Sequence, residues 1–401
     1  MKKFEQQAIT ETNELWEPCN QRLEPIEQRQ NEIRSNFWRD YNRILHSKAY
    51  RRLKHKTQVF HATQNDHVCT RIEHVQHVCS VSYSITQQLG LNTELALAIG
   101  IGHDIGHAPF GHDGEKILNQ LAEQYFQGNF WHEGNGLFFA DKIEMLQNEN
   151  GSNTHLNLTY AVRDGIISHC GEVDQNGIRP RNEYINLYDI SRPNQYQPFT
   201  WEACIVKIAD KISYLGRDLE DAQRLKILGK IQLEELNDIR SRYYSHLLPS
   251  ASNTALIHNF AIDLCQNSSP QEGICFSEAC FQTINAIKKF NYQHIYSHPR
   301  LGYYRQYAQM IITSIFHMLN NLYHNGTPEQ GLKENEACFP KLIRSFSKWL
   351  DDYTDYNADN ENVIYSVLDN QSNYQKSIIG FISSMSDYFA IEIHHELISF
   401  E

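Results

Sequence analysis

The strongest constraint on the fold of this chain is an apolar helix that ends in two polar residues. Residues 95–102 read Leu-Ala-Leu-Ala-Ile-Gly-Ile-Gly, and His103 and Asp104 follow at once. An imidazole and a carboxylate are costly to bury at the end of such a helix unless something binds them. A divalent metal can bind both, because imidazole suits transition metals and carboxylate suits hard and transition metals alike. We therefore expect an ion-binding centre inside a helical core.

The rest of the chain also favours an all-α fold. Glycine and proline are dispersed, strand-like alternation is rare, and helical periodicity dominates. The pattern predicts helices over 35–56, 70–89, 93–105 and 201–228. The glycines and Pro109 of residues 106–114 predict a turn, with a helix resuming near Glu115. Loops are expected over 57–66, 148–155 and 171–200, the last with room for a short hairpin.

The composition argues against a membrane protein, a disulfide-rich secreted protein and a general nucleic-acid-binding protein. The 401 residues allow one large domain or a core with appendages. No apolar run approaches the roughly 18 residues of a membrane span, and the N-terminus lacks the apolar segment of a signal peptide. The nine cysteines are an odd number without a Cys-x-x-Cys pair, which is typical of reduced thiols in a cytoplasmic protein. A net charge of −12 argues against general nucleic-acid coating but leaves room for a local basic site.

Residues 39–56 form such a basic cluster, in which Asp40 is the single acid. Its seven cations are Arg39, Arg43, Lys48, Arg51, Arg52, Lys54 and Lys56. One interpretation is a solvated helix face. The other is an anion site, because the cluster directly precedes the histidine-rich motifs.

Two further helices can supply metal ligands. Arg71 and His74 are three residues apart on one helix face, and Asp210 lies on a helix whose opposite face is apolar. A lone histidine on a helix is more often structural than a ligand. Together with His103 and Asp104, however, His74 and Asp210 make a mixed nitrogen and oxygen site that leaves positions open for water and substrate.

The helix of Asp210 also carries a polar stripe. Tyr214, Arg217 and Asp218 follow Asp210 at helical spacing, so the four side chains lie along one face. An exposed, salt-bridged face explains this pattern. A surface that holds a metal, phosphates and a sugar explains it as well.

Four side chains after the apolar helix are candidates for catalysis. His107 follows His103 by one helical turn, and His112 lies three residues before Glu115, close enough for the carboxylate to orient the imidazole. His132 adds another imidazole with a carboxylate next to it in sequence. Each histidine alone could belong to the core or the surface, but their density favours a catalytic site with His112 as the general acid or base.

The order of these motifs resembles the HD superfamily of metal-dependent phosphohydrolases. Five segments are similar to bacterial deoxyguanosine triphosphate triphosphohydrolases and their deoxynucleotide relatives: 43–60, 103–115, 131–133, 209–214 and 381–390. The resemblance is strong over 35–225 and weaker elsewhere, and Tyr388 stands where the family usually has arginine. It implies an HD-domain helical core at 67–228, an N-terminal helical arm at 1–66 and a C-terminal helical extension at 229–401.

The resemblance also implies a reaction, which is metal-dependent hydrolysis of dGTP or other deoxynucleoside triphosphates (dNTPs) to deoxynucleoside and inorganic triphosphate. The ion, Mg, Mn or another transition metal, would be held by His74, His103, Asp104 and Asp210. The triphosphate would be gripped by Arg71, His107, His132, Lys211 and Arg217. The substrate's sugar would meet Gln58, Val59, Tyr214 and Asp218, with the Tyr214 ring under the deoxyribose. His112 with Glu115 would transfer protons, and a homo-oligomer is expected.

Two alternatives stay open at this point. Another HD phosphohydrolase, acting on nucleoside monophosphates, alarmones or cyclic dinucleotides, would share the metal ligands but would not need the Gln58-Val59 loop or Tyr214. A single-stranded DNA- or RNA-binding protein with a vestigial HD site would instead use residues 39–56. The intact ligand set and the net charge of −12 argue against this second alternative.

Overall fold

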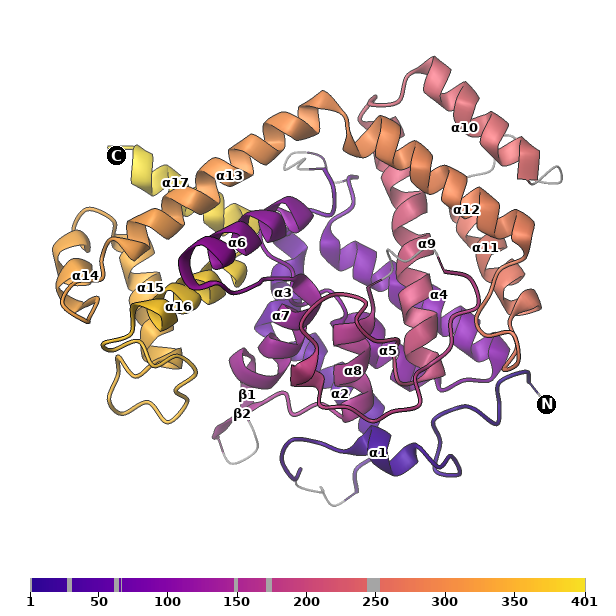
Figure 1. The fold of residues 1–401 in the computed structure, drawn as a ribbon, viewed down its shortest axis with the longest axis horizontal. Coiled ribbons are helices and arrows are strands. Elements are labelled where there is room, and N and C mark those ends of the chain that lie inside the picture. The colour runs from indigo at the N-terminus through magenta and orange to yellow at the C-terminus, as the bar shows by residue number, and fades with distance from the viewer. Residues whose placement is uncertain are drawn as a thin grey trace.

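The computed structural model describes residues 2–26, 31–60, 65, 67–147, 151–170, 175–243 and 253–400. These residues are mostly helical, which confirms the all-α prediction (Figure 1). The first half of the chain contains α1 (Trp16–Asn20), α2 (Asn36–His46), α3 (Lys48–Arg52), the 3₁₀ turn η1 (Leu53–His55), α4 (Arg71–Leu89), α5 (Thr93–Gly102), α6 (Gly111–Phe126), α7 (His132–Phe138), the π turn η2 (Phe139–Ile143), strands β1 (Met145–Gln147) and β2 (Asn153–His155), α8 (Tyr160–Ser168) and the 3₁₀ turn η3 (Leu187–Asp189). The second half contains α9 (Trp201–Arg224), α10 (Lys230–Tyr243), α11 (Asn253–Asn267), α12 (Glu278–Asn291), the π turn η4 (Tyr292–Tyr296), α13 (Pro299–Asn320), α14 (Glu329–Asn335), α15 (Pro340–Tyr353), α16 (Gln371–Ser383) and α17 (Asp387–Ile398).

The apolar helix α5 lies at the centre of the fold. It begins where the Asn92 side chain accepts hydrogen bonds from the backbone N–H groups of Glu94 and Leu95, both at 3.1 Å. It packs against α2, α4, α8 and α9. Because helices surround α5 on several sides, its apolar residues are buried. His103 and Asp104, which directly follow its last residue, therefore lie in the interior.

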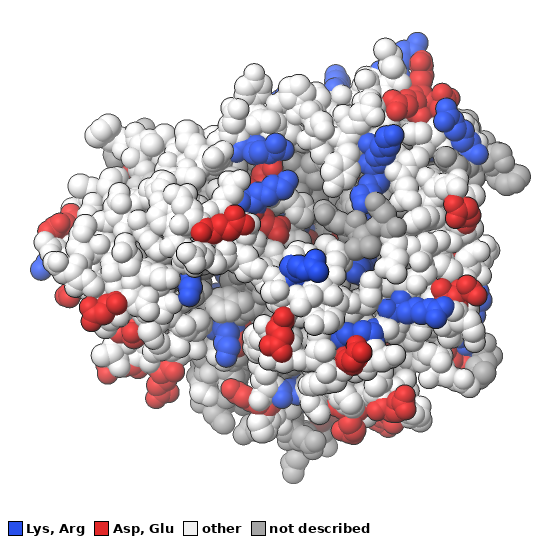
Figure 2. All heavy atoms as spheres, in the orientation of Figure 1, with Lys and Arg blue, Asp and Glu red and all other residues white. Residues whose placement is uncertain are grey.

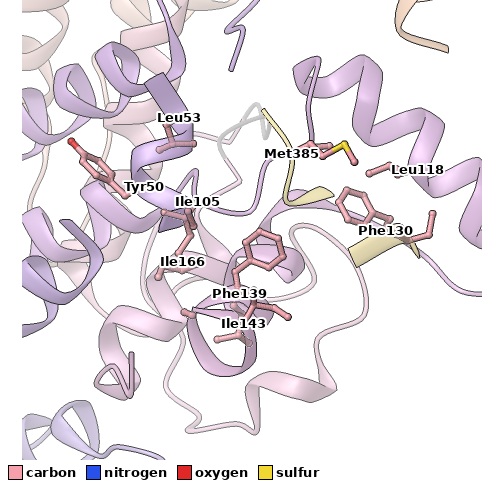
Figure 3. Close-up of a cluster of buried hydrophobic side chains, with 14 of the residues drawn as sticks. Tyr50, Leu53, Ile105, Leu118, Phe130, Phe139, Ile143, Ile166 and Met385 are labelled. Atoms are coloured by element: carbon pink, nitrogen blue, oxygen red, sulfur yellow. The ribbon is translucent and has the colours of Figure 1, made fainter. Parts of the chain in front are cut away.

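The C-terminal region packs on this centre from two directions. Helices α11 and α12 contact α9, whereas the long α13 contacts α6, α16 and α17 (Figure 1). Met385, between α16 and α17, belongs to the same hydrophobic cluster as Leu118 of α6 and Phe130, which follows α6 (Figure 3). No helix in the described ranges is both long and apolar enough to cross a bilayer.

Several predicted elements have other bounds or another place in the structure. The helix expected over 35–56 is interrupted at Ser47, whose hydroxyl donates to Ile44 O (2.7 Å) at the end of α2 and accepts from Tyr50 N (3.2 Å) at the start of α3. The helix expected near Glu115 begins four residues earlier, at Gly111. The hairpin is not found in 175–200, the described part of the expected range; instead β1 and β2 pair antiparallel, with Met145 opposite His155.

Some of the predicted loop residues lie outside the described part of the chain. These are residues 61–64 and 66 in the first loop, 148–150 in the second and 171–174 in the third.

The basic cluster at 39–56 is not a single solvated face, because Arg39 and Lys56 are buried; its use as an anion site stays a prediction. Arg43 donates to the backbone oxygens of His155 and Leu156, and Arg52 pairs with Glu144 at 2.9 Å. These cations therefore hold the β hairpin and its flanks in place. Figure 2 shows acidic and basic side chains interspersed over the face in view, without a continuous basic band.

Candidate active site

One cavity of about 850 Å³ opens beside the C-terminal end of α5. Its size suits a ligand as large as a drug or cofactor. Twelve of the predicted site residues line it: Gln58, Val59, Arg71, His74, Asp104, His107, His112, Glu115, His132, Asp210, Tyr214 and Asp218. The structure thus brings together residues from the N-terminal loop, α4, the end of α5, α6, α7 and α9.

The four predicted metal ligands lie close together at one side of this cavity: His74, Asp104 and Asp210 line it, and His103 is buried next to them. His74 Nε2 lies 2.9 Å from Asp210 Oδ1 and 4.0 Å from Asp104 Oδ2. His103 Nε2 lies 3.5 Å from Asp104 Oδ1 and 4.0 Å from Asp210 Oδ1. His74, His103 and Asp210 thus offer ligand atoms within 4.8 Å of one another, with Asp104 beside both imidazoles. Two imidazole nitrogens and two carboxylates are a donor set typical of a divalent transition metal.

The hydrogen bonding of His103 supports the fit to a cation. Its Nδ1–H donates to Gly100 O at 2.7 Å, so Nε2 is the nitrogen that faces the other ligands. That nitrogen is fully buried, has no hydrogen-bond partner and faces two carboxylates. A buried polar atom without a partner is unfavourable, and a bound cation would give this nitrogen a partner. His103, Asp104, His74 and Asp210 thus fit a divalent ion.

Arg71 and Asp104 form a buried ion pair at the edge of the ligand set. Arg71 Nη1 donates to Asp104 Oδ2 at 2.8 Å, and both side chains are almost fully buried. Burial alone would raise the pKa of Asp104, but His103, His107 and Arg71 outweigh burial and hold the pKa well below its usual value. Asp104 is therefore ionised and available to a metal.

Two imidazoles, those of His107 and His132, stack at 3.8 Å between ring centroids. The contact depends on Gly106, because a Cβ atom there would lie 2.1 Å from Gly136 N. Burial, Arg71 and His132 together lower the pKa of His107. Although burial opposes it, Glu133 and Glu115 raise the pKa of His132 to about 10. The pair therefore combines a neutral imidazole with a cationic one.

The predicted pair of His112 and Glu115 is formed, with Nδ1 of His112 3.2 Å from Glu115 Oε2. Glu115 has a second partner that its spacing in sequence did not predict. It lies 3.1 Å from His132 Nδ1 and accepts from His132 N at 3.0 Å. One carboxylate thus orients two imidazoles. Of the two, His112 is the accessible one, with 54% of its side chain exposed against 10% for His132.

Another wall of the cavity is aromatic. Tyr214 lines it together with Tyr292, Tyr296 and Tyr304 from the C-terminal region. Tyr296 donates to Asp218 at 2.5 Å, and burial raises the pKa of that carboxyl to about 7. Sequence analysis missed the three C-terminal tyrosines, because no local motif marks η4 or the start of α13.

Two predicted phosphate-binding residues do not line the cavity. Arg217 pairs with Glu220 at 2.9 Å and contacts His77, and Lys211 is buried outside the cavity wall. Their proposed contacts with a triphosphate stay predictions.

His169 lines the cavity although sequence analysis did not select it. It directly follows α8, its Nδ1–H donates to Ile166 O at 2.7 Å, and its ring centroid lies 5.0 Å from that of His103. Burial, together with His103 and His132, lowers its pKa to about 3. A signal was present in the sequence, because α8 is a largely apolar helix followed by histidine, as α5 is.

The C-terminal region also supports the site through hydrogen bonds to Asp387, which is 3% exposed. One carboxylate oxygen accepts from Phe110 N and the other from Thr57 N, both at 2.8 Å. Phe110 has φ +63, and its turn leads directly into the helix of His112. Nearby, the buried Lys56 ammonium donates to the backbone oxygens of His107 and Ser383. Asp387 therefore fixes both the Gln58 loop and the turn that precedes His112.

We expect Asp387→Asn to lower the free energy of unfolding by about 1–3 kcal/mol, because one of two buried N–H groups loses its acceptor. It should also lower kcat, since the turn before His112 loses a restraint. Urea unfolding and steady-state kinetics measure the two effects. The control is Glu202→Ala, because Glu202 is buried and its Oε1 accepts from both Ile9 N and Asn92 N at the opposite end of α5, so this variant also leaves N–H groups without an acceptor. An equal loss of kcat in both variants would show that Asp387 acts through general stability alone.

Comparison with protein families identifies the domains of this chain. Residues 71–215 match the HD domain, and residues 274–336 match the phosphohydrolase-associated domain. The chain is therefore an HD-domain protein of a phosphohydrolase family, and the first match contains all four predicted metal ligands.

Whole-chain relatives narrow the family. A deoxyguanosinetriphosphate triphosphohydrolase-like protein of Clostridium tetani is 32% identical over 82% of this chain and 86% of its own length. Proteins of the same name from Caldanaerobacter subterraneus subsp. tengcongensis (31% identical; 71% of this chain, 72% of the relative) and Allorhizobium ampelinum (28%; 91% and 89%) also match. The chain belongs to the family of deoxyguanosinetriphosphate triphosphohydrolase-like proteins, which confirms the resemblance seen in its motifs.

Proposed function

We propose that the chain hydrolyses deoxynucleoside triphosphates to deoxynucleoside and inorganic triphosphate. The observation that carries the proposal is that one cavity joins a fitted metal centre, a histidine–glutamate pair and an aromatic wall. The metal centre suits a phosphoryl group, the histidine–glutamate pair suits a proton transfer, and the aromatic wall suits a nucleoside. The names of the relatives support the same substrate class.

His74, His103, Asp104 and Asp210 would hold a divalent ion (Mg, Mn or another transition metal), which would supply Lewis-acid stabilisation of charge on the phosphoryl group. Arg71 and the cationic His132 line the same cavity and neutralise further charge on the phosphate oxygens. These groups are already fixed by hydrogen bonds, so little reorganisation is needed when the substrate binds.

His112 handles the proton in this proposal. Because Glu115 engages Nδ1, Nε2 is the nitrogen left to exchange a proton with the attacking or the leaving oxygen. Glu115 keeps the imidazole in one tautomer and orientation. In this proposal, Gln58 and Val59 contact the 3′ side of the sugar, and Tyr214 packs under the deoxyribose. Asp218 and Tyr296 close the end of the cavity in which the sugar lies.

The direct test is an assay of purified protein with Mg or Mn against the four dNTPs, GTP, deoxynucleoside monophosphates and cyclic dinucleotides. Phosphorus NMR of the products distinguishes the reactions. Inorganic triphosphate released from a dNTP supports the proposal. Cleavage of monophosphates or cyclic dinucleotides, with dNTPs left intact, would support the alternative HD phosphohydrolase instead.

Assembly and location are separate proposals. We propose a cytoplasmic homo-oligomer, and light scattering measures its size. Binding of single-stranded DNA by the exposed cations Lys48, Arg51 and Lys54 is the alternative use of the basic cluster. A monomer that binds single-stranded DNA tightly at physiological salt would favour that alternative.

We expect Tyr214→Ala to raise activity on ribonucleotides relative to deoxynucleotides. The Tyr214 ring lines the cavity one helical turn after Asp210. In the proposed substrate pose the ring would leave no room for a 2′-hydroxyl beneath the sugar. Ratios of kcat/KM for GTP and dGTP measure the change. Tyr214→Phe is the matched control, because it keeps the ring and should keep the preference. A wild-type enzyme that cleaves GTP as well as dGTP would contradict the steric argument.

A further inference from the structure

Arg305 on α13 is a cation at the cavity that a single carboxylate holds through one nitrogen. Its Nε donates to Asp113 Oδ1 at 2.8 Å, and both side chains line the cavity. Within the described part of the chain, Nη1 and Nη2 of Arg305 have no hydrogen-bond partner. A guanidinium has N–H donors and no acceptor, so the donors on these two nitrogens are left for a ligand.

The residues beside Arg305 on α13 indicate what kind of ligand this is. Leu301, Tyr304 and Arg305 are spaced by three and four residues, so they share one face of the helix, and all three line the cavity. An aliphatic side chain and an aromatic ring next to a cation suit a flat, apolar ring system with acceptors on its edge. A nucleobase has this chemistry, whereas a phosphate group does not.

The position of Tyr304 places this face of α13 at the nucleoside end of the cavity. The Tyr304 hydroxyl lies 3.5 Å from Thr57 Oγ1, and Thr57 directly precedes Gln58 and Val59. In the proposed function these two residues contact the sugar. The next group along the substrate from the sugar, on the side away from the phosphates, is the base.

We propose that Arg305 contacts the base of the substrate and selects guanine. Guanine presents two acceptors, O6 and N7, on one edge, and arginine binds this pair bidentately. Adenine and cytosine present an amino donor on the corresponding edge, and thymine presents one acceptor, O4. Because Arg305 offers only donors, it bonds twice to guanine and once to thymine, and it meets a donor in adenine and cytosine. The inference rests on the proposed function, since it concerns the base of a dNTP.

Asp113 is a positioning residue for this contact. The Arg305 side chain is 52% exposed, so the ion pair itself adds little to stability. The bond to Nε instead fixes the plane of the guanidinium, and a bidentate contact depends on that plane. We expect Asp113→Asn to reduce the preference for dGTP by less than Arg305→Ala does, because the amide keeps an oxygen that Nε can bond.

The test compares kcat/KM for the four dNTPs in the wild type, Arg305→Ala and Arg305→Lys. In Arg305→Ala the value for dGTP should fall at least about tenfold further than the value for dATP. Arg305→Lys should restore only part of this preference, because an ammonium keeps the charge but not the planar fork. Arg300→Ala is the matched control, since Arg300 is an exposed arginine of the same helix that does not line the cavity. It should keep the wild-type preference.

Base analogues identify the atoms that Arg305 contacts. The analogue dITP lacks the 2-amino group of dGTP but keeps O6 and N7, so the wild type should cleave it nearly as well. In 7-deaza-dGTP a carbon replaces N7, and the wild type should cleave this analogue less well than dGTP. The difference between dGTP and 7-deaza-dGTP should disappear in Arg305→Ala, because the variant has no donor for N7.

The outcomes separate this inference from the proposed function. Asp113 directly follows His112, so the competing assignment for Arg305 is a contact with phosphate, which every dNTP shares. Equal losses on all four dNTPs in Arg305→Ala would favour that assignment and overturn the base contact, while dNTP hydrolysis itself stays supported. An unchanged preference in Arg305→Ala, folded by thermal melting, would overturn the base contact as well. A wild type that cleaves no dNTP would contradict both proposals.

Discussion

Asp210→Ala is expected to abolish hydrolysis and to remove the ion held by His74, His103 and Asp104. Asp210 Oδ1 is the carboxylate atom nearest to His74 Nε2, and it lies within reach of His103 Nε2 as well. Its loss leaves the metal centre with one carboxylate and two imidazoles. Because Lewis-acid stabilisation of the phosphoryl oxygens depends on the ion, activity should fall below detection at any substrate concentration.

Asp210 is a better choice for this experiment than Asp104. Asp104→Ala would also leave the buried Arg71 guanidinium without its carboxylate partner, and breaking a buried pair in this way destabilises a protein by about 3–5 kcal/mol. Its inactivity could then reflect unfolding. Asp210 instead contacts the imidazoles of His74 and His103, so a folded, metal-free Asp210→Ala protein isolates the role of the ion.

Metal content and thermal melting are the measurements. Asp218→Asn is the matched control, because Asp218 lies two helical turns further along α9 and faces Tyr296 instead of the ligands. It should keep the ion. Stoichiometric metal in folded Asp210→Ala would refute this ligand assignment.

The metal centre was predictable because its signals are local. His103-Asp104 ends an apolar segment, and His74 and Asp210 lie on helices whose faces follow from a period of 3.6 residues. The structure places all four side chains in one cluster. Residue type and helical spacing were therefore enough to predict that these four side chains lie together.

The aromatic wall was not predictable in this way. Tyr296 meets Asp218 across 78 residues of sequence, and nothing near Tyr296 marks it as part of a site. The same holds for Asp387, whose contacts with Thr57 and Phe110 join the two ends of the chain. Contacts of this kind depend on how the C-terminal helices pack, which a local pattern does not contain.

Helix position alone does not decide whether the Lys211 and Arg217 side chains reach the cavity. Lys211 follows Asp210 by one residue, which turns its side chain by about 100° away from that of Asp210. Arg217 does share the face of Asp210, but its long side chain turns to Glu220 and His77. Sequence spacing along a helix predicts the position of a Cα atom. The position of a flexible guanidinium depends on the partners that it can reach.

His112→Ala is expected to lower kcat by about 10²–10⁴-fold while leaving KM and metal content nearly unchanged. His112 contributes no ligand to the metal centre, and its Nε2 is the nitrogen left for proton transfer once Glu115 engages Nδ1. Glu115→Ala should cost at least as much, because Glu115 orients His132 as well. His132→Ala should raise KM more than it lowers kcat if its main contact is with phosphate.

Because 54% of the His112 side chain is exposed, the space left in His112→Ala is open to solvent, and added imidazole should restore part of kcat. His107→Ala is the matched control for this rescue, because His107 is buried and imidazole in solution cannot take its place. Rescue that saturates with imidazole and follows the fraction of imidazole in one protonation state would assign the proton transfer to position 112. Near-normal kcat in His112→Ala, with activity abolished in His107→Ala or His132→Ala, would move the acid–base role to one of those two histidines.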